Sequence, residues 1–571
     1  MLPVRGRGLR ASNRATGSPE TGVGMSRTRY RVARTVATVV ATVGLVAALT
    51  AAVVGGRQAA GAAQAPGGGR VLLVGNYKGH QGKYTTIQAA VDASRPGDWI
   101  LVAPGIYHEV DDATHPPTAD SAGAFGGVVI TTPRVHVRGM DRAGVIVDGT
   151  KPGSSTPCSS DPSLQNRGAL DSAGSPYGRN GIVVSKANDV SIENLTVCNF
   201  LAGSSDGSGN EIWWNGGYDT GKIGLKGYVG NYLTTTSTFF ADNDGAAKYG
   251  IFSSNAQGPA TWDTVYASNF SDSGMYVGAC LKVCNVVINH AWMENSALGY
   301  SGTNSGGAII VKDSEFDNNT DGFDTNTQLE GDPPAPQDGA CPGNKVSPIT
   351  HTHSCWVFMH NNVHDNNNPN VPKTGNAGEV PTGTGMTISG GRNDTVMDNT
   401  FTNNGAWGVV FLPFPDPGTP SLTQTCSGTG GVQNAAFGCV YDPQGNALLR
   451  NTFSHNAFFG NPANADYAQL LLNAGTPQNC FRSNTAPAGS VPADLEQSQS
   501  TCGPITTAAN TDPTLLGQLL CDSGVGSCPA GSSYPTTSGV VMQPLPKNLQ
   551  PMPNPCKGVP NSAWCVKGKP A

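Results

Sequence analysis

Two aspartates, Asp321 and Asp324, stand three residues apart in the segment Asn319-Thr-Asp-Gly-Phe-Asp324. Enzymes that hydrolyse glycosidic bonds place paired carboxyl groups across the bond, one as the acid and one as the base or nucleophile. These two aspartates are therefore the leading candidates for acid–base chemistry in this chain. An Asn-turn followed by glycine would produce the same segment for structural reasons alone, and both interpretations remain open.

A second group of residues suits the removal of a proton beside a substrate carboxylate. That reaction needs a base, an acid and a cation that neutralises the carboxylate. The side chains of Tyr276, His351, His353 and Arg392 could fill these roles. Each of them taken singly is better explained as an ordinary surface residue. They form a candidate catalytic site only if the fold brings them together.

Other side chains could bind a sugar or a cation. Trp213 and Trp214 could stack on sugar rings, although adjacent residues can equally point one inward and one outward. The segment Asp242-Asn-Asp244-Gly is similar to the start of a calcium loop but lacks the required glutamate. The sequence establishes no cofactor. Calcium bound by Asp242 and Asp244 is the one candidate ion.

Two further spacings suit metal ligands less well. Cys280 and Cys284 are not followed by a second Cys/His pair at the spacing of a zinc finger. His360 and His364 have a spacing that binds metal on a helix, but here they stand in a strand and turn pattern. We expect structural roles for the two histidines.

An internal repeat of about two dozen residues must position these side chains. A glycine followed by alternating side chains is interspersed with the pattern Asn-x-apolar-x-x-Asn, as in Asn399-x-Phe401-x-x-Asn404. Strands this short cannot close a core alone and must stack on neighbouring repeats. Asparagines at the turns can then hydrogen-bond along the stack. The glycines that mark the repeat are Gly250, Gly274, Gly299, Gly322, Gly385 and Gly408.

The segments from Tyr84 to Asp98 and from Trp99 to Glu109 carry a family resemblance. They read as a short amphipathic helix with apolar Ile87, Ala90 and Val91, followed by a strand and a Pro-Gly turn. Together with the repeat, this opening resembles the pectin-lyase-like superfamily over roughly residues 70–485. The resemblance implies an all-β fold, a right-handed parallel β-helix whose first coil is capped by the helix.

Asn319-Thr-Asp321 also resembles the Asn-Thr-Asp element of polygalacturonases within this superfamily. The family's Asp-Asp pair, Gly-His-Gly and Arg-Ile-Lys elements do not follow downstream. The resemblance therefore gives little support to a polygalacturonase mechanism.

Alternation along the strands divides the repeat into an inner and an outer face. Residues one position after each glycine are apolar and should point inward. Residues two positions after it should form an outward ladder, which places Ser301 beside Asp324. Thr303 and Asn326 follow on the same face, so we predict that these three polar residues bind substrate. The predicted ladder is Phe252, Tyr276, Ser301, Asp324, Thr387 and Val410.

The repeat delimits three regions. We expect a basic leader at residues 1–65, a β-helix domain at 66–500 and a Cys/Pro-rich tail at 501–571. Insertions near residues 202–227 and 327–381 should become loops that border a groove on the solenoid. The tail should cover the C-terminal end, whose open strands need protection.

The leader predicts export. Several arginines precede the uncharged run from Thr35 to Gly56, and Ala63-Gln64-Ala65 fits a signal-peptidase site. The run is also just long enough to span a bilayer, so a cleaved signal and a retained membrane anchor at residues 35–56 both remain open. Either outcome makes the body secreted or extracellular.

The chain has fourteen cysteines, which predict disulfides outside the cell. Short spacings suggest local bridges, although sequence cannot establish the connectivity. The suggested pairs are Cys280/Cys284, Cys341/Cys355, Cys426/Cys439, Cys521/Cys528 and Cys556/Cys565.

The 571 residues carry a formal net charge of −6. The basic leader offsets part of the negative charge of the remaining residues. Residues 1–65 hold nine Arg and one acid, which leaves 34 − 9 = 25 bases and 40 − 1 = 39 acids, or −14. An acidic body argues against general nucleic-acid binding. We expect a polysaccharide partner, no nucleic acid, and a monomer, because both ends carry candidate caps.

The family resemblance implies a protein that acts on or binds a polysaccharide. The reaction stays open between elimination, epimerisation and hydrolysis of a uronic-acid-containing glycan. The alternative is a non-catalytic surface or secreted protein that binds a glycan or another partner.

Overall fold

The computed structural model describes most of the chain after the leader. The leader expected at residues 1–65 lies outside the described residues. Within the described part, no helix is long and apolar enough to cross a bilayer. The described residues are 69–110, 124–217, 222–241, 245–327, 336–416, 425–435, 438–473, 475, 477–503, 505, 512–524 and 526–571.

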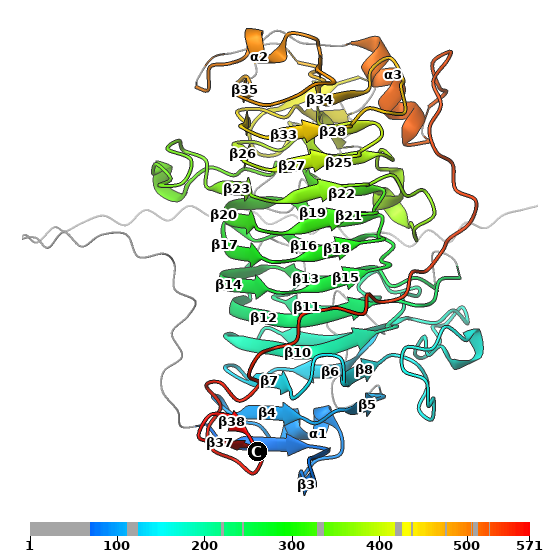
Figure 1. Cartoon of the computed structure of the whole chain (residues 1–571), viewed down its shortest axis with the longest axis vertical. Coiled ribbons are helices and arrows are strands. Elements are labelled where there is room, and N and C mark those ends of the chain that lie inside the picture. The colour runs from blue at the N-terminus through cyan, green and yellow to red at the C-terminus, as the bar shows by residue number, and fades with distance from the viewer. Residues whose placement is uncertain are drawn as a thin grey trace, which may run out of the picture. The chain divides into compact units, whose positions relative to one another are not determined.

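The chain winds into the expected right-handed parallel β-helix (Figure 1). One parallel sheet has eleven strands and forms one side of the coils. Its strands are β6 (Phe125–Ile130), β9 (Arg179–Ser185), β11 (Asn210–Asn215), β13 (Tyr249–Ser254), β16 (Ser273–Gly278), β19 (Leu298–Thr303), β22 (Asp321–Asn326), β25 (Thr384–Ser389), β28 (Trp407–Leu412), β34 (Ala465–Gln469) and β36 (Ser490–Val491).

A 20-stranded sheet forms the remaining sides, with two strands in most coils. Its strands are β1 (Val71–Val74), β4 (Trp99–Val102), β5 (Gly105–Tyr107), β7 (His136–Gly139), β8 (Val145–Asp148), β10 (Val190–Cys198), β12 (Leu225–Thr236), β14 (Ala256–Asp263), β15 (Tyr266–Ser268), β17 (Leu281–Asn289), β18 (Trp292–Glu294), β20 (Ser305–Lys312), β21 (Glu315–Asp317), β23 (Trp356–Met359), β24 (Asn362–His364), β26 (Asp394–Met397), β27 (Thr400–Thr402), β32 (Ala447–Leu449), β33 (Thr452–Ser454) and β35 (Cys480–Arg482).

Short antiparallel pairings decorate the solenoid. They involve β2 (Asn76–Tyr77), β3 (His80–Gln81), β29 (Phe414–Asp416), β30 (Gly431–Asn434), β31 (Gly438–Tyr441), β37 (Cys565–Val566) and β38 (Lys569–Pro570).

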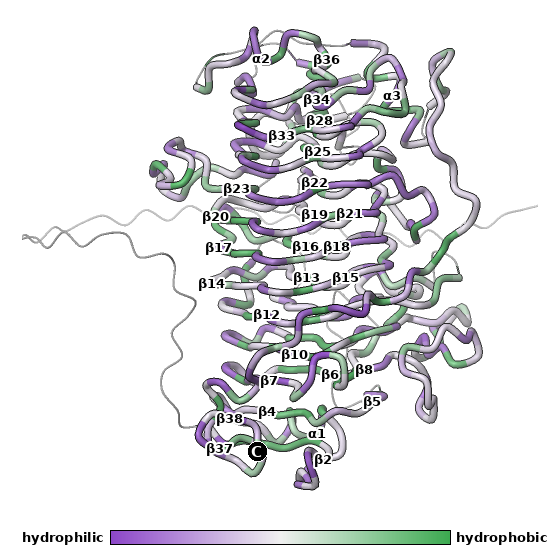
Figure 2. The backbone as a smooth tube through the Cα atoms, in the orientation of Figure 1, coloured by the Kyte–Doolittle hydropathy of each residue, from purple (hydrophilic) through white to green (hydrophobic). Residues whose placement is uncertain are grey.

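The core follows the predicted inner row. Residues one position after the repeat glycine pair across neighbouring strands and are buried, for example Met275 with Tyr300 and Phe323 with Met386. The rings of Tyr300 and Phe323 stack with their centroids 4.1 Å apart. Apolar segments, green in Figure 2, recur in successive coils, as at β17 and β20. Stacked like residues thus build one continuous core along the solenoid.

Asparagines join the coils at the turns, as the repeat predicts. The backbone N–H and the side-chain amide of Asn319 both donate to Asn366 Oδ1, at 3.2 and 3.0 Å. Asn366 repeats this arrangement on Asn404, and Asn404 on Asn456. Each buried amide therefore satisfies the turn of the preceding coil.

The predicted amphipathic helix is present as α1 (Ile87–Asp92). Thr86 caps its N-terminus by accepting a hydrogen bond from the backbone N–H of Ala89. Its apolar side chains Ile87, Ala90 and Val91 are buried in the main core. The role of α1 as a cap for the first coil stays a prediction.

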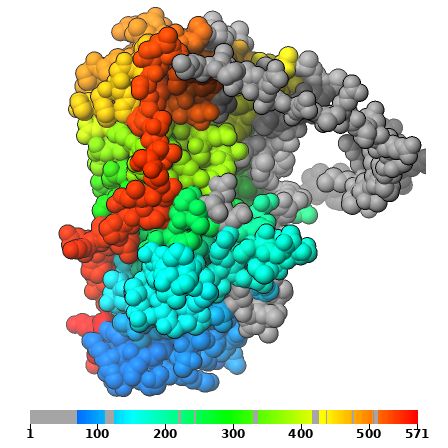
Figure 3. Space-filling model, turned by 90° about the vertical axis from the view of Figure 1, so that its right-hand side faces the viewer, coloured from blue at the N-terminus to red at the C-terminus, as the bar shows by residue number. Residues whose placement is uncertain are grey.

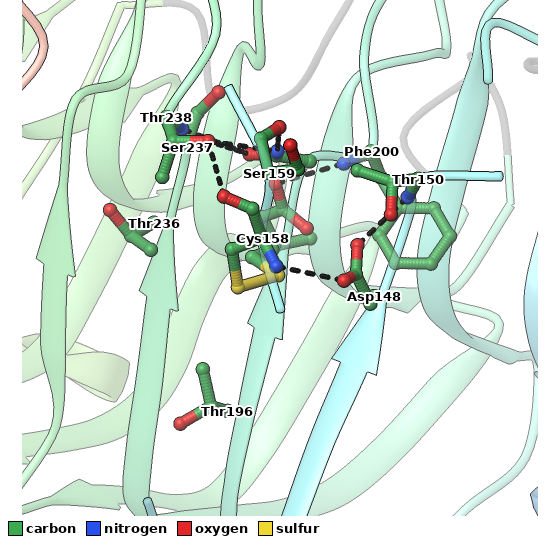
Figure 4. Close-up of a disulfide and its surroundings, with 12 residues drawn as sticks. Asp148, Thr150, Cys158, Ser159, Thr196, Phe200, Thr236, Ser237 and Thr238 are labelled. Carbon is green, nitrogen blue, oxygen red and sulfur yellow. Dashed lines mark hydrogen bonds between the residues drawn. A yellow bond between two sulfur atoms is a disulfide. The ribbon is translucent and has the colours of Figure 1, made fainter. Parts of the chain in front are cut away.

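All fourteen cysteines form disulfides. The five local pairs suggested by the sequence are confirmed. Cys158–Cys198 and Cys480–Cys502 complete the set. Around Cys158, its backbone N–H donates to Asp148 and its carbonyl accepts from Thr238 (Figure 4). Seven disulfides indicate an extracellular or periplasmic location.

The C-terminal region covers more of the solenoid than we expected. The short helix α2 (Leu495–Ser498) and the helix α3 (Pro513–Asp522) lie at its C-terminal end, and the last residues run back along the coils to the first ones (Figures 1 and 3). There the Trp564 indole donates to the carbonyl of His80. The tail carries no repeat, so nothing in its sequence indicates this distant partner.

Candidate functional site

The predicted outward ladder is present on the outer side of the 11-stranded sheet, which we call the ladder face. Register pairs Phe252 with Tyr276, Tyr276 with Ser301, Ser301 with Asp324 and Asp324 with Thr387. The strand before β13 adds Trp213 beside Phe252.

Four aromatic rings gather at the N-terminal half of this face, and we call them the aromatic platform. Trp213 stacks on Phe252 at 5.2 Å between centroids, and Tyr249 stacks on Phe252 at 4.7 Å. Tyr276 meets Phe252 and Tyr249 edge-on, at 4.8 and 5.3 Å. Trp213 is buried, whereas Tyr249, Phe252 and Tyr276 are partly exposed. The platform therefore offers aromatic surface to a ligand.

One glycine makes the platform possible. Tyr249 and Phe252 are three residues apart, yet their rings stack on the outer side of the sheet. In the pairing of β13 with β16, Tyr249, Ile251 and Phe252 have partners and Gly250 has none, which shifts the alternation of side chains at that point. A Cβ on Gly250 would lie 2.5 Å from the carbonyl oxygen of Gly274. The repeat glycine thus allows close packing of coils where the strand begins.

Trp214 points the other way. It is fully buried and packs against Tyr228 and Trp262 inside the solenoid. The two tryptophans therefore point to opposite sides of the sheet, Trp213 to the outer side and Trp214 to the core. Trp214 therefore has no surface for a sugar.

Asp321 and Asp324 lie on the ladder face, but both are buried, with exposed fractions of 0% and 5%. Asp324 accepts hydrogen bonds from Thr387 at 2.6 Å, from Ser389 at 3.1 Å and from Asn326. Burial raises the pKa of both carboxyl groups, and the charge of Asp324 raises that of Asp321 further. The pair is therefore a sealed polar cluster, not two carboxylates open to a glycosidic bond.

Asp272 is a partly exposed carboxyl group on this face. The Tyr249 hydroxyl donates to Asp272 Oδ2 at 2.8 Å. Burial raises the pKa of Asp272 to about 6, Tyr249 and the charge of Lys248 oppose this rise, and the charge of Asp324 adds to it. Asp272 was not among the predicted residues. Its place just before the repeat strand is visible in the sequence, but its aromatic partner Tyr249 lies 23 residues earlier.

The second part of the long insertion packs on the ladder face. Ala377 and Val380 contact Leu298, and Thr374 is hydrogen-bonded to Ser271 at 2.9 Å. Asp522, the last residue of α3, accepts from the backbone N–H of Thr382. This loop and α3 therefore border the face beside the aspartates.

Lys373 on the same loop interacts electrostatically with Asp522. Burial lowers the pKa of Lys373 to about 8 and raises that of Asp522 to about 8. The charge of Asp522 also raises the pKa of Asp321. Lys373 and Asp522 are therefore ionisable groups at the edge of the ladder face.

The structure does not assemble the other predicted catalytic residues around Asp324. His351 and His353 are exposed on the loop closed by Cys341–Cys355, and His353 Nδ1 contacts the carbonyl of Lys345. Arg392 donates to the carbonyl of Thr429. Within the described part of the chain, no hydrogen bond or ion pair joins these three side chains to Asp321 or Asp324. The first part of the insertion folds as a loop closed by the predicted Cys341–Cys355 disulfide, which holds both histidines on that loop.

The predicted binding residues have different positions. Ser301, Thr303 and Asn326 lie on the ladder face, but each is buried, so direct contact with a substrate stays a prediction. The calcium prediction at Asp242 and Asp244 falls outside the described residues.

A second group of chemically active side chains lies on the 20-stranded sheet. Glu315, Asp317 and His364 come together on β21 and β24. An open depression adjoins Glu315 and is lined in part by His290, Trp292 and His360. The spacing of His360 and His364 predicts a structural role, because only the register of the coils places His364 beside Glu315 and Asp317.

Comparison with known proteins adds a similarity of fold. No family model and no curated protein matches the sequence. The A-module of the Azotobacter vinelandii mannuronan C-5 epimerase AlgE6 matches with a TM-score of 0.39 and 12% identity, over 70% of this chain and 93% of that chain. The pectin methylesterase PemA from Erwinia chrysanthemi matches with a TM-score of 0.31 and 9% identity, over 72% and 93%. We base the functional proposal on the residues of this chain.

Proposed function

We propose that this is an exported protein that binds an acidic polysaccharide along the ladder face and transfers a proton on it. The observation that carries the proposal is the aromatic platform joined to Asp272. Tyr249 belongs to both, as a ring of the platform and as the hydrogen-bond donor to Asp272.

The platform supplies the binding surface. Partly exposed rings bury large apolar area against a ligand at a low cost in conformational entropy. Tyr249, Phe252 and Tyr276 offer such rings on neighbouring strands. Strands in a sheet stand about 4.8 Å apart, so the row runs across the coils and suits an extended chain molecule.

Asp272 supplies the acid–base group. A general acid or base works best when its pKa lies near the working pH, and that of Asp272 is raised to about 6. The Tyr249 hydroxyl orients its carboxylate. Lys248 acts on Asp272 electrostatically and is a candidate to neutralise a substrate carboxylate.

The arrangement favours elimination or epimerisation over hydrolysis. Hydrolysis needs two accessible carboxyl groups on either side of the bond. Asp324 is buried and held by three hydrogen bonds, so it serves better as a positioning residue that raises the pKa of Asp272. Proton abstraction beside a uronate carboxylate needs a base, an acid and a cation, of which Asp272 and Lys248 provide the base and the cation.

The proposal is tested with the full chain and a panel of acidic and neutral polysaccharides. Binding is measured together with unsaturated uronate absorbance, new reducing ends and solvent deuterium incorporation. Asp272→Asn should abolish turnover and leave binding within about threefold. Phe252→Ala with Tyr276→Ala should weaken binding by about tenfold or more. Tyr232→Ala, on the 20-stranded sheet, is the matched aromatic control and should change neither.

Two outcomes would overturn the proposal. Full turnover in Asp272→Asn would remove the acid–base role from that residue. Unchanged binding in the double aromatic variant would remove the glycan from the ladder face.

A non-catalytic glycan-binding protein is the second candidate. The observation that favours it is the burial of Asp321 and Asp324. Of these two aspartates and Asp272, Asp272 alone is partly exposed, so the three do not supply two accessible carboxyl groups. Binding that depends on the aromatic platform, without any of the three chemical signals, would select this candidate.

A further inference from the structure

We infer that Glu315, Asp317 and His364 bind one divalent transition-metal ion, with Zn²⁺ the best fit. One ligand atom from each side chain lies within 4.8 Å of the other two. This cluster belongs to the 20-stranded sheet and shares no residue with the ladder face, so it is independent of the proposed glycan site.

The register of the coils creates the cluster. Asp317 pairs with His364 on the next coil, and Glu315 stands two positions before Asp317 on the same strand. The intervening Phe316 is buried in the core, so Glu315 and Asp317 share the outer side. The three ligands therefore sit on rigid, stacked strands.

The groups around the ligands hold them as in known metal sites. His364 Nδ1 lies 2.7 Å from Asp365 Oδ2, and its Nε2 lies 2.9 Å from Glu315 Oε1. A carboxylate on one imidazole nitrogen is the usual device that orients the other nitrogen toward a metal. Asp365 thus presents Nε2 to the side where Glu315 lies.

Asp317 is oriented in the same manner. The Trp292 indole donates to Asp317 Oδ1 at 2.7 Å, and the Asn318 amide donates to Oδ2 at 2.6 Å. Each carboxylate oxygen has a second lone pair, so these hydrogen bonds leave room for a metal bond. Burial and two donors fix the carboxylate before any ion arrives.

The donor set selects the class of ion. Imidazole nitrogen and carboxylate oxygen are both ligands of Zn²⁺, whereas Ca²⁺ and Mg²⁺ prefer oxygen donors alone. Three protein ligands leave a fourth position for water or another ligand. The open depression beside Glu315 gives access to that position.

The local charge also favours a cation. Glu294 pairs with Asp317 on the preceding coil, so Asp317 has two neighbouring carboxyl groups, those of Glu294 and Glu315. Like charges on adjacent strands repel one another, and a divalent ion would offset that repulsion.

The test uses the full chain, freed of metal with a chelator and titrated calorimetrically with ZnCl₂, CaCl₂ and MgCl₂. We expect Zn²⁺ to bind with a dissociation constant in the micromolar range or tighter, and the other ions to bind far more weakly. His364→Gln and Asp317→Asn should each weaken Zn²⁺ binding by about 100-fold or more. Asp365→Asn should weaken it by about 10- to 100-fold, because it only orients His364.

A matched control separates this site from adventitious binding. His455→Gln alters an exposed histidine whose ring contacts Asn403, and it should leave the high-affinity event unchanged. Circular dichroism and melting of the metal-free variants verify that they fold. If a buried variant does not fold, Glu315→Gln replaces it, because that side chain is 44% exposed. Absence of Zn²⁺ binding by the wild type, or equal affinity in these variants, would overturn the inference.

Discussion

The ionisation of Asp272 makes the stability of the folded chain depend on pH. The pKa of its carboxyl group is raised to about 6, chiefly by burial, so the folded chain holds this proton more tightly than the unfolded chain does. A group with a raised folded pKa contributes stability that is complete below its unfolded pKa, near 4, and is lost as the pH rises through 6. The residue proposed to transfer a proton is therefore also one that costs stability at neutral pH.

We expect Asp272→Asn to remove this loss. The amide keeps the shape of the carboxyl group and does not ionise, so the free energy of unfolding should fall less between pH 4 and pH 7 than in the wild type. The difference between the two proteins should be about 2 kcal/mol across that interval. Urea unfolding at both pH values measures it. An identical pH dependence in the two proteins would contradict the pKa assigned to Asp272.

At the scale of elements, the turn asparagines link one coil to the next. Asn404 Oδ1 accepts from both the backbone N–H and the side chain of Asn366, and the Asn404 amide in turn donates to the carbonyl of Val363. These groups are buried, so removing the side chain takes a partner from the backbone N–H of Asn366 and from the carbonyl of Val363.

Asn404→Ala should therefore destabilise the solenoid by about 2–4 kcal/mol. Asn362→Ala, on the exposed side of β24, is the matched control and should change stability by no more than about 0.5 kcal/mol. Chemical denaturation of both variants measures the difference. A loss below about 1 kcal/mol for Asn404→Ala would mean that water replaces the hydrogen bonds of the turn asparagine.

Local spacing explains which elements could be predicted from the sequence. The repeat glycines and alternation predicted the rows on both sides of the 11-stranded sheet, and short Cys spacings predicted five disulfides. Asp272 beside Tyr249, and His364 beside Glu315, became visible only through the register between coils. Insertions of unequal length separate the coils, so no fixed interval in the sequence joins such partners.

At the scale of the whole molecule, the C-terminal tail connects the two ends of the solenoid. Arg138 donates to the carbonyls of Pro555 and Lys557, and Arg142 donates to that of Gln550. Trp564 is buried in a cluster with Trp99 on β4. In a repeat protein each coil contacts only its neighbours, so ends fray first. The tail gives the first coils a second set of contacts.

Truncation after residue 540 should therefore loosen the first coils selectively. We expect faster amide hydrogen exchange in β1, β4 and β7, because their outer side loses the apolar contacts of Trp564 and the hydrogen bonds of Arg138. Exchange in β25 and β28 should stay within about twofold, because α3 remains in place. Trp564→Ala, which keeps the rest of the tail, should reproduce part of the effect. Uniform acceleration along the whole solenoid would instead show that the tail stabilises every coil equally, and unchanged exchange in β1 and β4 would show that it stabilises none.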